Sequence, residues 1–186
     1  MTAPLILASR SPQRRAILEQ LGIPFEVVLP DVDEREQGPA EEVALENARS
    51  KADAVAQHRP GELVLAVDTV VSLDGRIYGK PADVAQARRT LTALAGRTHQ
   101  VVSALCLIGP GGPRAATAST RVTLRPADPR LLDWYLAGGE WRERAGGYAI
   151  QGRGAALIGA IEGDYTNVVG LPVPTLLALE PGLLAL

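Results

Sequence analysis

Near the N-terminus, residues 5–15 read LILASRSPQRR, an apolar run that gives way to a small polar turn and then to cationic side chains. The apolar run predicts a short buried strand that ends at the turn. Pro12 suits the first turn of a helix, because the N–H that proline lacks has no partner there. The side chains after the strand therefore meet exposed amides and the positive end of a helix dipole, which together attract anions. The candidate anion-binding residues are Ser9, Ser11, Arg14 and Arg15.

Strand and helix patterns alternate along the rest of the chain. Apolar or alanine residues spaced three and four apart predict helices, and continuous apolar runs predict strands. The expected helices span residues 14–21, 40–57, 82–94 and, after a cap at Asp128, up to 137, and a leucine-rich helix follows Pro172. The further expected strands span residues 25–29, 63–67, 101–108, 116–124 and 155–161. We therefore expect one α/β domain over residues 1–186, in which a mixed sheet with an antiparallel section carries helices on its faces.

Composition and charge restrict the classes of partner. The 186 residues carry 19 Lys and Arg against 21 Asp and Glu, a net charge of −2, so no global field attracts nucleic acid or a membrane surface. The single cysteine, Cys106, excludes disulfides and cysteine-based zinc sites within the chain, and its apolar surroundings predict a buried inert thiol. There is no N-terminal leader pattern and no apolar run of roughly 18 residues. We expect a cytoplasmic protein with no nucleic-acid or membrane partner.

Several common catalytic motifs are missing from the sequence. There is no G-x-x-x-x-G-K-[ST] phosphate loop, and the glycines at residues 152–154 do not form a Rossmann fingerprint. The two histidines, His58 and His99, lie far apart, which excludes an H-E-x-x-H zinc site and argues against a Ser-His-Asp triad. The remaining carboxylates, lysines and arginines fit the binding of a hard divalent cation and of phosphate.

Three carboxylates are candidates for that chemistry. Asp68 is expected to end the apolar strand at residues 63–67, where a carboxylate is poorly solvated. It either accepts a structural hydrogen bond from the following turn or acts as a metal ligand and base. Asp33 and Glu34 lie in an acidic loop, where they are either simply solvated or ligate a metal. Because ligands bind at the carboxyl ends of strands in such sheets, Ser9 and Asp68 are expected to share one cleft.

Two lysines and a glycine-rich bend complete the candidates. Lys51 lies at the edge of an alanine-rich helical stripe, from which it either reaches water or contacts phosphate. Lys80, between a glycine and a proline, is either an exposed turn residue or a phosphate ligand. Tyr148 and Gln151 are either strand residues in the bend, or a ring that stacks on a nucleobase and an amide that hydrogen-bonds to it.

Taken together, six blocks of the sequence resemble those of the Maf family of nucleoside triphosphate pyrophosphatases. They are LASRSPQRR (7–15), AVDTV (66–70), GKP (79–81), GRTHQV (96–101), AGGYAIQG (145–152) and VVGLP (168–172). The blocks occur in order and are spread over nearly the whole chain, from residue 7 to residue 172, which makes the resemblance specific. It implies a bent α/β fold of the Maf and inosine-triphosphatase type, with a deep cleft between two lobes.

The resemblance also implies a reaction. The family hydrolyses a nucleoside triphosphate between its α and β phosphates, with a divalent metal cation such as Mg²⁺ or Mn²⁺. By position, Asp68 is similar to the general base of the family, and Glu34 is similar to its acidic partner at the metal. The residues that match the family's phosphate-binding lysines and its opening motif are Lys51, Lys80, Ser9 and Arg14.

The block YAIQ resembles the subfamily that acts on dTTP and UTP, in which the positions of Thr69 and Gln151 are associated with base selection. The sister subfamily, which acts on 7-methyl-GTP, has a different block there, with phenylalanine and glutamate. Gln13 departs from the family, which usually has two arginines directly after Ser-Pro. Because the first of them is associated with substrate choice and glutamine brings no charge, the expected specificity is open to a shift. Arg15 compensates only if it reaches around the helix, since one residue is a rotation of about 100°.

The resemblance leaves two other matters open. A nucleotide-binding regulator of cell division without turnover is the competing function, and the retained acidic and basic residues argue against it. The protein is expected to be a monomer or a homodimer.

Overall fold

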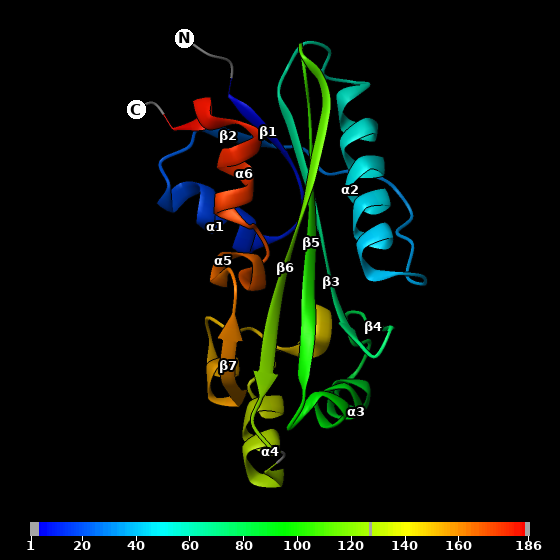
Figure 1. Ribbon diagram of the computed structural model, residues 1–186, viewed down its shortest axis with the longest axis vertical. Coiled ribbons are helices and arrows are strands. Elements are labelled where there is room, and N and C mark those ends of the chain that lie inside the picture. Colours follow the sequence, from blue (N-terminus) through cyan, green and yellow to red (C-terminus); the bar gives the residue numbers. More distant parts are fainter. Residues whose placement is uncertain (1–3, 127, 185–186) are drawn as a thin grey trace.

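The structure is a computed structural model that describes residues 4–126 and 128–184 (Figure 1). A seven-stranded mixed sheet forms its centre, with the strand order β2-β1-β3-β5-β6-β7 and with β4 paired to β3 outside this path. The strands are β1 (Leu5–Ala8), β2 (Phe25–Val27), β3 (Val64–Leu73), β4 (Arg76–Tyr78), β5 (Thr98–Gly109), β6 (Gly112–Leu124) and β7 (Ile158–Glu162). The helices are α1 (Pro12–Gln20), α2 (Ala40–Ala56), α3 (Val84–Leu94), α4 (Pro129–Ala137), α5 (Tyr165–Val169) and α6 (Val173–Leu179), with 3-10 helices η1 (Ala145–Gly147), η2 (Arg153–Leu157) and η3 (Pro181–Leu183).

This architecture confirms the expected α/β fold with a mixed sheet. β1 runs parallel to both β2 and β3, whereas β3, β5, β6 and β7 pair antiparallel in succession. The strong bend implied by the resemblance is not confirmed, because the sheet is an open path of strands that does not close on itself. Within the described residues, no helix is both long and apolar enough to cross a lipid bilayer.

Helices cover both faces of the part of the sheet that contains β1 (Figure 1). α2 packs on one face through a stripe of alanines, and residues 64, 66 and 70 of β3 face it. α1 and α6 pack on the other face, against residues 65 and 67 of β3. Because side chains alternate along a strand, Asp68 faces α2 and Thr69 faces α1.

Asp68 does not end its strand, so that expectation is wrong. β1 ends at Ala8, opposite Ala66, but β3 continues because β5 pairs with it antiparallel along nearly its whole length. Asp68 therefore lies in the middle of β3. Ser9 does follow the carboxyl end of β1, as expected. The two residues thus lie where β1 stops and β3 continues.

The other part of the molecule is built on the start of β5 and the end of β6, which pair with each other (Figure 1). There α3, α4 and β7 surround a second hydrophobic core. The expected strand over residues 155–161 is wrong in its first part, because residues 153–157 form η2. A Cβ at Gly154 would lie 2.4 Å from the carbonyl oxygen of Ala149, so this glycine allows the chain to fold back tightly before β7 begins. A short helix that the pattern does not predict, α5, precedes the leucine-rich α6.

Candidate active site

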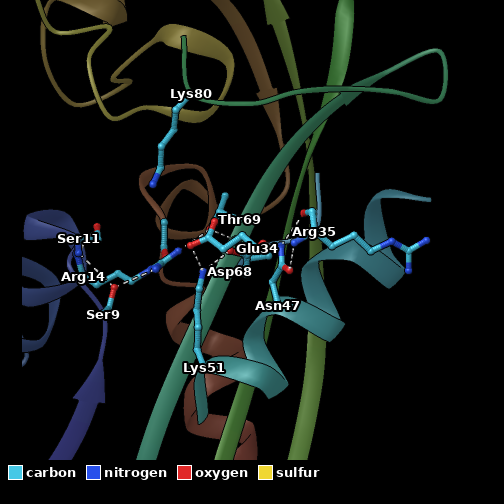
Figure 2. Close-up of polar contacts among 12 residues, drawn as sticks. Ser9, Ser11, Arg14, Glu34, Arg35, Asn47, Lys51, Asp68, Thr69 and Lys80 are labelled. Carbon is cyan, nitrogen blue, oxygen red and sulfur yellow. Dashed lines mark hydrogen bonds and ion pairs between the residues drawn. The ribbon is translucent and has the colours of Figure 1, made fainter. Parts of the chain in front are cut away.

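Three buried polar side chains meet between α2 and β3 (Figure 2). Nζ of Lys51 donates a hydrogen bond of 2.6 Å to Oδ1 of Asp68, and Nδ2 of Asn47 donates one of 3.2 Å to Oδ2. The exposed fractions are 6% for Lys51, 4% for Asn47 and 5% for Asp68. Asn47 and Lys51 are four residues apart and share the face of α2 that packs on the sheet. Lys51 and Asn47 thus replace water as hydrogen-bond donors to the buried carboxylate of Asp68, as a buried charge requires.

A second carboxylate reaches the same ammonium from the loop before α2. Nζ of Lys51 lies 2.9 Å from Oε1 of Glu34, whose side chain is 43% exposed. Burial raises the pKa of Glu34, but the hydrogen bond and charge of Lys51 and the charges of Lys80 and Arg14 outweigh it and hold this pKa below its ordinary value. Lys51 therefore links a buried carboxylate on the sheet to a half-exposed one on the loop.

The loop that carries Glu34 is held by Asn47, a residue that the sequence pattern does not single out. Oδ1 of Asn47 accepts a hydrogen bond of 2.8 Å from the backbone N–H of Arg35, and Nδ2 donates one of 3.0 Å to the carbonyl oxygen of Arg35. With the bond to Asp68, the amide uses both of its polar ends within the protein. The signal in the sequence is its position: Asn47 shares the buried face of α2 with Lys51, where an amide must find partners.

On the other side of β3, Arg14 of α1 ties the turn after β1 to the sheet (Figure 2). Its guanidinium donates to Oγ of Ser9 at 3.0 Å, to Oγ1 of Thr69 at 3.1 Å and to the carbonyl oxygen of Gly170 at 2.8 Å. No ion pair in the part of the chain that the structure describes involves Arg14. Burial lowers the pKa of Arg14, and the two nearby carboxylates oppose this shift. The site thus holds a half-buried cation that no direct carboxylate contact neutralises.

Lys80 approaches the carboxylates from the segment after β4. Figure 2 shows its side chain extending toward Glu34 and Asp68. The side chain is 56% exposed, and Nζ lies 3.8 Å from Oε2 of Glu143, a weak ion pair between exposed groups. Its charge is one of those that lower the pKa of Glu34. The predicted site residues that the structure brings together are Asp68, Glu34, Lys51, Lys80, Ser9, Arg14 and Thr69.

The remaining residues of the opening stretch lie at the start of α1. Ser11 caps the helix, since its Oγ accepts from the N–H of Arg14 at 3.5 Å, and its own N–H donates to Oγ of Ser9 at 3.2 Å. Oε1 of Gln13 accepts a hydrogen bond of 3.1 Å from Oγ of Ser11. Arg15 is half-buried, and its Nε has no hydrogen-bond partner among the described residues. Ser11 and Gln13 therefore join the network around Ser9, whereas Arg15 does not.

Among the described residues, no hydrogen bond joins Tyr148 or Gln151 to this network. Tyr148 is 6% exposed and packs in the second core, where its hydroxyl forms a hydrogen bond of 2.7 Å with Nε2 of His99. Burial lowers the pKa of His99 to about 4, so its imidazole is neutral in neutral solution. Gln151 is exposed, and no hydrogen bond of the described residues joins it to the network. Cys106 is buried as expected, and burial raises the pKa of its thiol to about 11.

Two carboxylates, Asp68 and Glu34, are the candidate metal ligands. Among residues 4–126 and 128–184, no three His, Cys, Asp or Glu side chains gather into a metal-binding cluster. The two carboxylates do converge on one ammonium, that of Lys51. Mg²⁺ usually binds through one or two carboxylates together with substrate phosphates. This pair fits such a cation when a phosphate substrate supplies further oxygen ligands.

Comparisons of sequence and fold identify relatives of this chain. The family model for Maf-like protein matches residues 4–180. The dTTP/UTP pyrophosphatase of Nitratidesulfovibrio vulgaris is 51% identical over 180 residues, which cover 95% of this chain and 86% of that protein. Proteins of the same name from Symbiobacterium thermophilum and Deinococcus radiodurans are 47% and 45% identical, over 91% and 97% of this chain and 88% and 94% of their own lengths. The crystal structure of protein VC0702 from Vibrio cholerae aligns at 11% identity and a TM-score of 0.39 over 72% of this chain and 69% of its own, which is too weak to inform the fold. On the family match and these identities, the chain belongs to the Maf-like protein family.

Proposed function

We propose that the protein is a nucleoside triphosphate pyrophosphatase that converts dTTP and UTP to the monophosphate and pyrophosphate. One observation carries this proposal: Lys51 joins Asp68 to Glu34, and the charges of Lys80 and Arg14 act on Glu34. Carboxylates serve as a base and as ligands of a divalent cation, and the cationic side chains suit a triphosphate. The reaction and the two nucleotides are those in the names of the relatives.

Substrate binding rests on the cations and on the start of α1. Arg14 has no carboxylate partner in the described chain and Lys80 has a weak one, so a triphosphate gains their charge-assisted hydrogen bonds without breaking a strong ion pair. The turn at Ser9 and Ser11 adds hydroxyl groups, and the start of α1 adds the positive end of its helix dipole. Arg15 is a further proposed phosphate contact. Together these groups hold the phosphate chain in line with the attacking water.

Asp68 is the proposed general base. Its carboxylate takes a proton from a water molecule, the water oxygen bonds to the α-phosphorus, and the bond from that phosphorus to the oxygen bridging to the β-phosphorus breaks. Pyrophosphate leaves with the electron pair of the broken bond. Lys51 and Asn47 keep the carboxylate in one orientation, because each of its oxygens is held by a separate donor. As the substrate enters, Lys51 keeps its bond to Asp68 and exchanges its contact with Glu34 for a phosphate oxygen.

Asp68 and Glu34 are the proposed ligands of Mg²⁺ or Mn²⁺. When bound, such a cation neutralises the negative charge that develops on the phosphate oxygens. Glu34 suits this role because its lowered pKa keeps the carboxylate ionised, and because it lies on an exposed loop and contacts the same ammonium as the buried Asp68.

Thr69 and Gln151 are the proposed determinants of base selection. Oγ1 of Thr69 contacts both the guanidinium of Arg14 and Oγ of Ser103, which fixes the hydroxyl beside α1. Gln151 is exposed at the end of a segment that Tyr148 anchors in the core, so its amide is accessible to a nucleobase. In this arrangement the buried side chain of Tyr148 holds the segment that ends at Gln151 against the second core.

A panel of triphosphates tests this function. With Mg²⁺ or Mn²⁺, the purified protein is expected to release pyrophosphate from dTTP and UTP about tenfold faster than from purine nucleotides, a barrier difference of about 1.4 kcal/mol. A preference for 7-methyl-GTP would contradict the pyrimidine assignment. Nucleotide binding without pyrophosphate release from any member of the panel would contradict the enzyme and favour a nucleotide-binding regulator.

A further inference from the structure

Gln13 holds an arginine from a distant part of the chain at the start of α1. Its Oε1 accepts a hydrogen bond of 2.6 Å from Nη1 of Arg144, a residue 131 positions further along, and one of 3.1 Å from Oγ of Ser11. Ser11 is bonded in turn to Ser9, and Ser9 is bonded to Arg14. The guanidinium of Arg144 is therefore continuous with the polar network of the candidate active site.

Arg144 is a cation without direct neutralisation in the described chain. It is half-buried, and burial lowers its pKa from the ordinary value, while the negative charges of Glu140 and Glu143 oppose this shift. None of the ion pairs within residues 4–126 and 128–184 includes Arg144, and its Nε is buried there without a hydrogen-bond partner. Gln13 offers it only a neutral amide oxygen. An anionic ligand at this place would offset the cost of taking the guanidinium out of water.

The turn that carries Arg144 is anchored beside Lys80. Glu143 adopts a φ of 57°, which is uncommon for a residue with a side chain, and it forms the ion pair with Lys80. Gly146 has a φ of 70°, and its N–H donates to the carbonyl oxygen of Gly79 at 3.3 Å. A Cβ at Gly146 would lie 3.0 Å from a side chain of β3. Such backbone conformations persist only where the surroundings hold them, and here they direct Arg144 toward α1.

We infer that Arg144 is a further substrate-binding residue, which supplies to the phosphate chain the positive charge that Gln13 lacks. This inference rests on the proposed function, since it requires an anionic substrate. Gln13 is the positioning residue of the pair, because its amide oxygen orients the guanidinium. An arginine at position 13 would instead repel Arg144. Arg144, in the turn after α4, thus places a positive charge at the start of α1, where Gln13 is neutral.

The test compares Arg144→Gln with the exchange variant Gln13→Arg/Arg144→Gln. For each, the release of pyrophosphate from UTP gives kcat and KM, and titration with inorganic pyrophosphate gives Kd. Arg144→Gln is expected to raise KM and Kd about tenfold with little change in kcat, because a contact to the phosphate chain holds substrate and transition state alike. The exchange variant is expected to recover most of the affinity, since it returns the charge from the neighbouring position.

Arg142→Gln is the matched control. It removes the same charge two residues away, from an exposed arginine that lies over the ring of Trp141. Its KM and Kd are expected to equal those of the wild type. Unchanged constants in Arg144→Gln, equal losses in both variants, or no recovery in a folded exchange variant would each contradict the inference. If Arg144→Gln does not fold, Arg144→Met decides, because it removes the charge and keeps the aliphatic stem: a KM raised about tenfold supports the inference, and an unchanged KM contradicts it.

The wild-type protein separates this inference from the proposed function. A wild type that releases no pyrophosphate from any nucleotide contradicts the proposed function, and the titration with pyrophosphate still decides the role of Arg144. An active wild type with an unaffected Arg144→Gln variant contradicts the role of Arg144 alone.

Discussion

At the scale of single residues, Asn47 couples the two carboxylates of the site. Its Oδ1 accepts from the backbone N–H of Arg35, next to Glu34. Its Nδ2 donates both to the carbonyl oxygen of Arg35 and to Asp68. The side chain is almost fully buried, so water does not replace these bonds when they are lost. Asn47 therefore fixes the distance between the loop and the sheet.

Asn47→Ala is expected to lower the free energy of unfolding by about 1–3 kcal/mol, because it leaves buried polar groups of Arg35 and Asp68 without partners. It is also expected to lower kcat for pyrophosphate release more than it raises KM, since the base loses its fixed orientation. Urea unfolding and steady-state kinetics measure the two effects. Ser50→Ala, an exposed change on the same helix, is the control and should alter neither. Wild-type kcat in Asn47→Ala would show that Asn47 does not position the base.

The sequence predicts individual residues well where their chemistry is local. Ser9, Ser11 and Arg14 form the expected polar turn, because strand, proline and helix start are neighbours in the chain, whereas Arg15 does not join it. The sequence predicts Lys51 only as a residue at the edge of the alanine stripe that reaches water or phosphate, and it does not predict Asn47, because the pattern does not show which buried partner a polar side chain finds. The contact between Gln13 and Arg144 was not predictable, because 131 residues separate its partners.

At the scale of elements, the extent of a strand depends on partners that lie elsewhere in the sequence. The apolar run that ends at Val67 predicts a strand end at Asp68, but pairing with β5 continues through Ser72. Similarly, the apolar residues after Gly154 predict a strand, while the close approach to Ala149 turns them into η2. Hydrophobic pattern alone therefore predicts that these elements exist and misplaces their ends.

A hydrogen bond between His99 of β5 and Tyr148 ties the glycine-rich segment to the sheet. The pKa of His99 is about 4 in the folded protein, below its ordinary value of 6.5, so the unfolded chain binds the proton first as the pH falls. The contribution of the neutral His99 imidazole to the free energy of unfolding is therefore complete above pH 6.5 and is lost as the pH falls toward 4. The free energy of unfolding is expected to decrease by about 2 kcal/mol from pH 7 to pH 5.

Urea unfolding at these two pH values measures this linkage. His99→Gln removes the titrating imidazole, so the decrease between pH 7 and pH 5 should be much smaller in this variant. His58→Gln, a change at an exposed histidine, serves as the control and should keep the wild-type decrease. The same decrease in His99→Gln and in the wild type would show that His99 is not the linked group.

At the scale of the whole molecule, the candidate site draws on elements that the single sheet holds together. β3 carries Asp68 and Thr69, α2 covers one face with Lys51, and α1 covers the other with Arg14 (Figures 1 and 2). The turn after α4 reaches this place from the opposite part of the molecule and brings Arg144 with it. Ser9, Arg14, Asp68, Thr69 and Lys80 lie within the six sequence blocks, whereas Glu34, Asn47 and Lys51 lie outside them. The pairing of the strands shows how these segments meet.

Asp68→Asn shows whether Asp68 is the base of a pyrophosphatase. The amide keeps the size of the side chain and removes the basic carboxylate. The decisive measurement is the release of pyrophosphate from UTP by this variant, with nucleotide binding measured alongside. We predict that release falls by at least about a thousandfold, or about 4 kcal/mol in the barrier, while the Kd for UTP changes only slightly. Release at the wild-type rate would show that Asp68 is not the base.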